Sequence, residues 1–181
     1  MKNWVTFFTQ TGSEIYQIIK QTGIVPKKII TNKKKSLFEK INSYLLNEYG
    51  YLIYNLPSNP SQNDYIKSLE GINEDDIITL HGYLRIIPSS ICDKFMIYNG
   101  HPGLITKYPE LKGFNPQEKA FNMKLSVTGS VIHKVVSEVD SGQIVLSREV
   151  NIQGMSLDEV YSALHNNSTK LWIQFLKKKF K

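Results

Sequence analysis

The polar residues that could do chemistry in this sequence lie beside glycines at the ends of predicted strands. Asn99 and His101 flank Gly100 directly after the apolar run Phe95–Tyr98. Such a pair can donate hydrogen bonds and move protons, but it also fits a tight turn with a solvent-facing histidine. Asp140 precedes a Ser-Gly pair between two β-rich runs, where aspartate is a common turn residue. The residue types alone leave both interpretations open at all three positions.

Five further residues carry weaker signals. Gly12 and Ser13 come between an apolar run and a helical pattern, where the N–H groups of a helix N-terminus can bind an anion. His81 follows a buried strand and could face a cleft. His133 alternates with two valines in a strand pattern, which favours a packed histidine, and His165 is interpreted as structural on the last helix.

The elements that must position these residues alternate between strands and helices in the first half of the chain. Short apolar and β-branched runs predict strands at residues 4–9, 25–31, 51–54 and 76–80. Apolar residues at helical spacing predict helices from Ser13 as N-cap, at 36–48 and at 65–69. This alternation predicts a parallel sheet covered by helices on both faces. Ligands of such sheets bind beyond the carboxyl ends of the strands, so we expect them near residues 10–13 and after Leu80.

The second half has a different pattern. A strand is predicted at 95–98 and, after a long loop, a helix at 117–121. Two β-rich segments joined by residues 137–142 predict an antiparallel pair, and Ser156 with Glu159 forms a capping box for the last helix. These two strands and the helix are expected at 125–136, 143–150 and 156–176. The predicted fold is α/β: a single Rossmann-like domain over residues 1–181, with a mostly parallel sheet and an antiparallel C-terminal strand pair.

Composition narrows the class of protein. A chain of 181 residues is typical of one domain, and 41% hydrophobic with 21% charged residues excludes wholesale disorder. No apolar run reaches the length of a membrane helix, so we expect no membrane association. The single cysteine, Cys92, excludes an internal disulfide and favours a reducing, cytoplasmic location.

The net charge of +6 favours polyanionic small molecules through its field. The basic residues cluster at Lys33–Lys35 and at 177–181 rather than forming one stripe, and no nucleic-acid-binding motif accompanies them. Such a basic tail is typically a solvated chain end, so nucleic acid is an unlikely partner.

Taken together, the segments resemble the folate-dependent formyltransferase family, and most of all its members in purine synthesis. The resemblance covers nearly the whole chain. It rests on these elements: Asn99-Gly100-His101-Pro102-Gly103, Lys107-Tyr108-Pro109, Lys112-Gly113, Val127-Thr128-Gly129 with His133, Asp140-Ser141-Gly142-Gln143-Ile144-Val145, and the upstream Gly82-Tyr83-Leu84-Arg85-Ile86-Ile87. Thr11-Gly12-Ser13 stands where the family places its substrate-phosphate loop.

The resemblance implies a catalytic set of Asn99, His101 and Asp140. Asn99 and His101 would donate hydrogen bonds to the oxyanion of a tetrahedral intermediate, His101 best as the imidazolium. Asp140 would raise the pKa of His101 and accept, directly or through water, the proton of the attacking amine. His133 would line the pocket.

The resemblance also implies the binding segments. The co-substrate would be 10-formyltetrahydrofolate, and no metal is needed. Its expected contacts are Tyr83, Leu84, Arg85, Ile86, Ile87, Glu138, Val139 and Ser141. The expected contacts of the amine acceptor are Thr11, Gly12, Ser13, Glu14 and Gly103.

The sequence also departs from the family pattern. Gln10 and Glu14 replace a glycine and the asparagine of the family's Gly-x-Gly-Ser-Asn loop, and a carboxylate repels a substrate phosphate. The stretch Phe114–Gln117 lacks the histidines that the purine-synthesis members have there. The chain is also short, which disfavours the members that carry a further domain, among them the methionyl-tRNA enzymes and the deformylases.

The expected function is therefore formyl transfer from 10-formyltetrahydrofolate to a primary amine, with glycinamide ribonucleotide as the first acceptor. The alternatives are formylation of an amino sugar or a modified nucleotide, hydrolysis of the formyl folate, and a non-catalytic folate- or nucleotide-binding module. The sequence does not distinguish a monomer from a homodimer.

Overall fold

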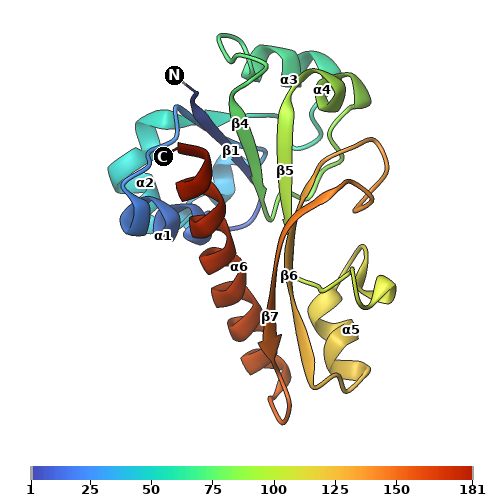
Figure 1. Cartoon of the computed structure of the whole chain (residues 1–181). Coiled ribbons are helices and arrows are strands. Elements are labelled where there is room, and N and C mark those ends of the chain that lie inside the picture. Colours follow the sequence, from blue (N-terminus) through green and yellow to red (C-terminus); the bar gives the residue numbers. More distant parts are fainter. Residues whose placement is uncertain (1, 181) are drawn as a thin grey trace. The chain divides into compact units, whose positions relative to one another are not determined.

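A computed structural model of the chain describes residues 2–180, which fall into two compact units (Figure 1). The first unit ends at Tyr98 and the second runs from Asn99 to Lys179. Strand β5 (Met96–His101) carries the chain from the first unit into the second. That residues 1–181 form one catalytic domain stays a prediction.

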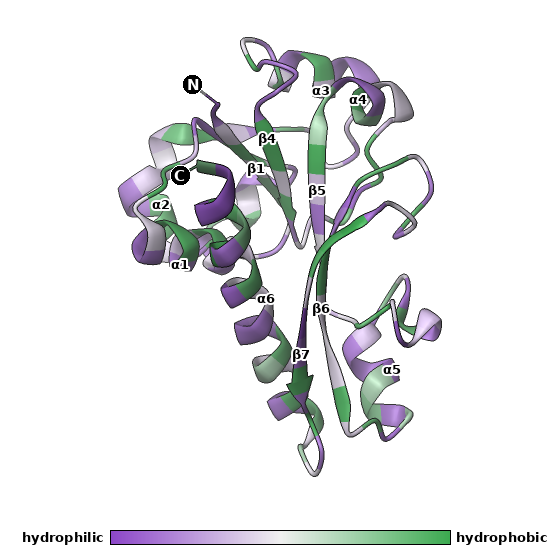
Figure 2. Cartoon of the chain, in the orientation of Figure 1, coloured by the Kyte–Doolittle hydropathy of each residue, from purple (hydrophilic) through white to green (hydrophobic). Residues whose placement is uncertain are grey.

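The first unit contains a parallel sheet in which β1 lies between β2 and β4. The strand order is β3-β2-β1-β4, and all three pairings are parallel, as the alternation of strands and helices predicts. All residues of β1 and β4 are buried, and both strands are rich in hydrophobic residues (Figure 2). The four strands are β1 (Trp4–Phe8), β2 (Lys28–Thr31), β3 (Ile53–Asn55) and β4 (Ile77–His81).

The helices of the first unit include α1, which packs Ile15, Ile18 and Ile19 into the core. Gly12, in a left-handed conformation, is the N-cap of α1, so the prediction of Ser13 as N-cap is wrong by one residue. Glycine adopts this conformation without a Cβ clash, and the chain can turn sharply from β1 into the helix. The helical segments are α1 (Ser13–Thr22), η1 (Lys35–Lys40), α2 (Ser43–Tyr49), η2 (Gly50–Leu52), α3 (Gln62–Ser68) and α4 (Ser89–Lys94).

The predicted helix at 36–48 is two pieces, because Ile41 adopts an extended backbone between η1 and α2. Asn42 then caps α2, its side chain accepting a hydrogen bond from the Leu45 N–H at 2.9 Å. Asparagine favours the N-cap over the helix interior, so a new helix starts here. Apolar spacing alone does not show this start and therefore predicted one longer helix. The Asn42 N–H donates to the Thr11 carbonyl at 2.8 Å and so ties α2 to the loop after β1.

The second unit is built on the antiparallel pair of β6 and β7, and the predicted pairing is confirmed. The long helix α6 is anchored to this pair by Asn167, whose amide donates to Ser130 Oγ at 3.3 Å and to the Arg148 carbonyl at 2.8 Å. The capping box of Ser156 and Glu159 starts α6 as predicted. The segments are β6 (Val127–Lys134), β7 (Ile144–Asn151), η3 (Pro109–Leu111), α5 (Pro116–Asn122) and α6 (Leu157–Phe180).

Strand β5 is longer than its apolar run predicts, and Asn99 and His101 lie within the strand rather than after it. Gly100 explains why this polar stretch stays extended. A Cβ at Gly100 would lie 2.6 Å from Nε1 of Trp172, so the absence of a side chain lets the ring pack against the strand.

The core of the second unit is apolar and draws on its helices, on β6 and on the loops between them. It contains the buried side chains of Leu104, Ile105, Leu111, Ala120, Val131, Ile152, Val160 and Leu164. Within residues 2–180, no helix combines the length and apolar character needed to cross a bilayer.

The close approach of β6 and β7 leads to a stability prediction. A Cβ at Gly129 would lie 2.2 Å from the Arg148 carbonyl oxygen, a backbone atom, so Gly129→Ala must displace a strand. We expect this substitution to lower the free energy of unfolding by at least about 2 kcal/mol in urea denaturation. Gly50→Ala is the control, because its Cβ would contact only Leu46 Cδ1 at 3.6 Å. Equal stability of the two variants would contradict the packing described here.

Candidate active site

The predicted catalytic residues Asn99, His101 and Asp140 all belong to the second unit. Asn99 and His101 are two residues apart on β5, so their side chains project from the same face of the strand. Asp140 lies in the connection between β6 and β7 and has a left-handed backbone with φ 52°. Its carboxylate Oδ2 lies 3.3 Å from His101 Nδ1, and both side chains are buried. The fold therefore brings together residues that are far apart in the sequence.

The Asp140 carboxylate contacts three other groups of this cluster. Besides His101, its Oδ1 lies 3.3 Å from Nε2 of His133, and its Oδ2 accepts the Gly113 N–H at 3.0 Å. Burial alone would raise the pKa of Asp140, but the hydrogen bond from His133, the nearby His101 ring and the Gly113 N–H outweigh it. The pKa falls to about 2, so Asp140 is a carboxylate at neutral pH.

His101 lies between a backbone carbonyl and the Asp140 carboxylate. Its Nε2 lies 2.7 Å from the Leu111 carbonyl, which can only accept, so Nε2 carries a hydrogen. Burial is the largest influence on His101 and lowers its pKa, although Asp140 and the Leu111 carbonyl both act to raise it. Asp140 thus acts to raise the pKa of His101, as expected, but burial outweighs this effect and the pKa lies below its ordinary value. His101 Nδ1 can donate to Asp140 Oδ2, 3.3 Å away, only when both ring nitrogens carry a hydrogen.

His133 connects Asn99 to Asp140, a closer involvement than lining the pocket. Nδ1 of His133 lies 3.0 Å from the Lys134 carbonyl, so this nitrogen donates. Its Nε2 lies 3.2 Å from the Asn99 amide nitrogen and 3.3 Å from Asp140. A neutral ring accepts from Asn99 there, and a protonated ring donates to Asp140.

Backbone groups complete the cluster. A Cβ at Gly103 would lie 3.1 Å from His101 Nε2, so this glycine leaves room for the imidazole. A Cβ at Gly142 would lie 1.7 Å from the Lys134 carbonyl oxygen, which makes glycine necessary in the turn after Asp140. The Leu111 carbonyl and the Gly113 N–H are the functional groups that residue types did not reveal, because backbone atoms carry no sequence signal.

The predicted acceptor loop and the first predicted folate segment meet in the first unit. Phe8 pairs with His81 in the parallel register of β1 and β4, so the carboxyl ends of these strands lie side by side. The Thr9 N–H donates to the Gly82 carbonyl at 3.2 Å, and the Leu84 N–H donates to Thr9 Oγ1 at 3.0 Å. This is the edge of the sheet at which ligands of parallel α/β folds bind.

Within the acceptor loop, side chains and packing hold the backbone in place. The Ser13 N–H donates to Thr11 Oγ1 at 3.3 Å, and the two hydroxyls lie 3.0 Å apart. A Cβ at Gly12 would lie 2.6 Å from Leu45 Cδ2, so α2 packs directly against the loop.

The folate segment 83–87 alternates between anchors and exposed side chains. Tyr83 is buried and shares a 2.8 Å hydrogen bond between hydroxyls with Tyr65; Ile87 is also buried. Leu84 and Ile86 are 50% and 73% exposed, an apolar pair left open to a ligand. Arg85 donates from Nε to the Ser58 carbonyl at 2.9 Å. In the second unit, the other predicted folate contacts, Glu138, Val139 and Ser141, are all exposed.

Glu14 and His81 form an ion pair that the sequence did not predict. Glu14 Oε2 lies 2.7 Å from His81 Nδ1, and the two residues are 67 positions apart. The proximity follows from the strand order, which places the start of α1 beside the end of β4.

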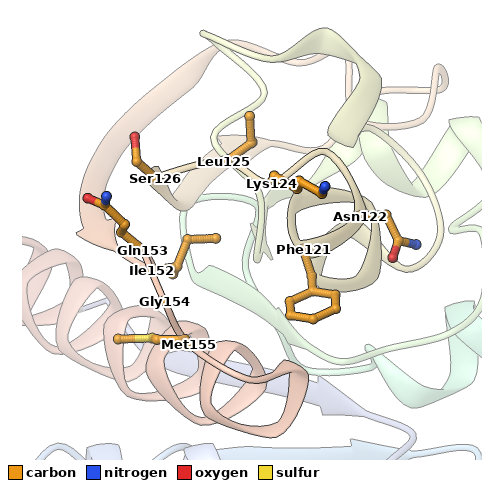
Figure 3. A pocket seen from close by; sticks show the side chains of 9 residues that line it. All are labelled: Phe121, Asn122, Lys124, Leu125, Ser126, Ile152, Gln153, Gly154 and Met155. Carbon is orange, nitrogen blue, oxygen red and sulfur yellow. The ribbon is translucent and has the colours of Figure 1, made fainter.

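A surface hollow of about 380 Å³ in the second unit is separate from the predicted site (Figure 3). Lys124 is the one titratable side chain in its lining, so this hollow does not offer a paired acid and base. It is lined by Phe121, Asn122, Lys124, Leu125, Ser126, Ile152, Gln153, Gly154 and Met155. Within residues 2–180, no group of three or more His, Cys, Asp or Glu side chains is arranged to hold a metal ion.

The mostly parallel sheet and its helices have the fold of the formyltransferase class of α/β proteins. The family model described as "Formyl transferase" matches residues 6–176. The chain belongs to this family, and the predicted family and fold class are confirmed.

Individual relatives fall into two branches of the family. The chain is 30% identical over 125 residues to the methionyl-tRNA formyltransferase of Thermotoga neapolitana, covering 67% of this chain and 39% of that protein. It is 29% identical over 137 residues to the phosphoribosylglycinamide formyltransferase of Dictyostelium discoideum, covering 67% of this chain and 65% of that protein. The match thus covers about two fifths of the length of the first relative and about two thirds of the length of the second.

A solved structure has the same fold over the whole chain. It is the phosphoribosylglycinamide formyltransferase of Streptococcus pneumoniae, with a TM-score of 0.82, 23% identity and coverage of 100% of both chains.

The low pKa of Asp140 predicts an acid-sensitive stability. The unfolded state takes up a proton near pH 3.8, whereas the folded state does so only near pH 2. Asp140 therefore contributes roughly 2 kcal/mol to the free energy of unfolding above about pH 4, and this contribution is lost between about pH 4 and pH 2. His101, whose folded pKa is lowered, adds a loss that begins as the pH falls below 6.5.

We expect Asp140→Asn to be less stable than the wild type at pH 7 and to show a shallower loss of stability below pH 4. Chemical denaturation between pH 2.5 and pH 7 measures both effects. Parallel curves for the two proteins below pH 4 would contradict the low pKa of Asp140.

Proposed function

We propose that this protein transfers a formyl group from 10-formyltetrahydrofolate to a primary amine. The observation that carries the proposal is the cluster of Asn99 with the buried His101 and Asp140, in a chain that belongs to the formyl transferase family. The folate co-substrate supplies the formyl group. The exposed apolar pair Leu84 and Ile86 suits a flat heterocycle, and the backbone groups between them can pair with its polar edge.

The cluster supplies the groups that this reaction needs. The attacking amine forms a bond to the formyl carbon, and negative charge develops on the formyl oxygen. We assign the Asn99 amide and the Nε2–H of His101 as hydrogen-bond donors to that oxygen, which stabilise it best in a buried site. In this role the formyl oxygen replaces the Leu111 carbonyl as the acceptor of the His101 hydrogen.

Asp140 is assigned the proton transfer. Its low pKa keeps it ionised, so it can receive the proton that the amine sheds, directly or through water. The proton then passes to the nitrogen of the folate from which the formyl group departs. His133 acts as a positioning residue, because its ring contacts both Asn99 and Asp140.

The acceptor that we propose first is glycinamide ribonucleotide. The names of the relatives from Dictyostelium discoideum and Streptococcus pneumoniae support this choice. Within the first unit, we assign Thr11–Glu14 to the acceptor and residues 83–87 to the folate. An amine without a phosphate is the second candidate, which the carboxylate of Glu14 in that loop favours.

The first experiment follows formyl release from 10-formyltetrahydrofolate spectroscopically, with and without glycinamide ribonucleotide. Release that depends on the acceptor would support the transferase and this acceptor. Release without any acceptor would indicate a hydrolase. Folate binding without release, with a panel of amines as well, would indicate a non-catalytic binding module.

The catalytic assignment predicts a large effect of two substitutions. His101→Ala and Asp140→Asn should each reduce turnover by at least about 100-fold, because each removes a positioned donor or proton acceptor. His165→Ala is the matched control, since His165 is an exposed histidine of α6, and it should retain wild-type turnover. Circular dichroism checks that all variants fold. Wild-type turnover in both site variants would refute the assignment.

A further inference from the structure

The first unit holds a second carboxylate–imidazole pair, Glu14 with His81, next to the loop that we propose binds the acceptor. Glu14 is the second residue of α1, and His81 is the last residue of β4. The side chain of His81 is 1% exposed and that of Glu14 is 13% exposed. This carboxylate is therefore a fixed part of the structure and not a mobile surface group.

The hydrogen bonds behind His81 determine how the pair is oriented. The Trp4 indole N–H, which can only donate, donates to Thr79 Oγ1 at 2.7 Å. Thr79 Oγ1 lies 2.9 Å from His81 Nε2, so the threonine hydrogen can be donated to that nitrogen. His81 then carries its own hydrogen on Nδ1 and donates it to Glu14. This chain of polar groups runs from Thr79 through His81 and ends at the negative charge of the Glu14 carboxylate.

The position of that charge matters for the acceptor. Glu14 lies in the first turn of α1, where the helix dipole stabilises a carboxylate. A second anion that approaches this helix end meets a negative charge already in place, and burial limits the screening by solvent. A hydroxyl or amine of the acceptor is instead attracted, because it can donate to a carboxylate.

We propose that the Glu14–His81 pair is a specificity determinant that disfavours a phosphate on the acceptor and favours a hydrogen-bond donor at the same place. This inference rests on the proposed function, because it concerns the acceptor loop of that site, and of the two acceptor candidates it favours the amine without a phosphate. It is specific to the pairing seen in this chain: the carboxylate supplies the selectivity, and Thr79 and His81 hold it in place.

The kinetic test compares two acceptors, glycinamide ribonucleotide and the corresponding riboside without phosphate. For each, kcat/KM is measured with the wild type, Glu14→Gln and Glu14→Asn. Glutamine keeps the shape and can still accept the His81 hydrogen, whereas asparagine also shortens the side chain. Both remove the charge, so the ratio of kcat/KM for the ribonucleotide to that for the riboside should rise at least about tenfold in each variant.

Glu48→Gln is the matched control. Glu48 is an exposed carboxylate of α2 that accepts a hydrogen bond from the hydroxyl of Tyr16, a residue of α1, at 2.8 Å. Its substitution changes the net charge by the same amount. It should leave the ratio within about twofold of the wild type. A ratio that rises equally in the Glu48 variant would show a general charge effect and overturn the assignment to Glu14.

A binding measurement separates this inference from the proposed function. Calorimetric titration with ribose 5-phosphate needs no turnover, and we expect at least about tenfold tighter binding to Glu14→Gln than to the wild type. Equal affinity would overturn the inference even in an active transferase. Tighter binding to the variant in a protein without turnover would support the inference while refuting the proposed function.

Discussion

The polar cluster of the second unit depends on the contacts that the Asp140 carboxylate makes. It accepts a hydrogen bond from the Gly113 N–H and lies 3.3 Å from a ring nitrogen of His101 and of His133. Burying a carboxylate is costly unless polar groups surround it, and here those groups come from three separate segments of the chain. The left-handed backbone of Asp140 and the glycine at position 142 are the local conditions that allow it to face them.

Two carbonyl groups determine which nitrogen of each imidazole carries a hydrogen. The Leu111 carbonyl requires it on Nε2 of His101, and the Lys134 carbonyl requires it on Nδ1 of His133. Burial lowers the pKa of His101, whereas Asp140 and the Leu111 carbonyl favour its charged form.

Local patterns predicted the strands, the antiparallel pair and the family, because apolar runs and motif residues carry those signals directly. They could not predict that His101 has a lowered pKa, since desolvation depends on how deeply Leu111 and its neighbours cover the ring. They also overestimated the helix at 36–48, because the extended backbone of Ile41 interrupts it. The pairing of Glu14 with His81 follows from strand order, which no local pattern contains.

The basic character of the chain and the carboxylate of Glu14 act over different distances and do not conflict. A net charge of +6 attracts anionic ligands through a field that salt screens within about 8 Å at physiological ionic strength. That attraction raises the rate of encounter for all anions alike and does not distinguish among them. Glu14 acts only on a group already at the start of α1, because its side chain is 13% exposed and is held by His81. Long-range charge therefore governs how often a ligand arrives, and the fixed carboxylate governs which chemical group can stay.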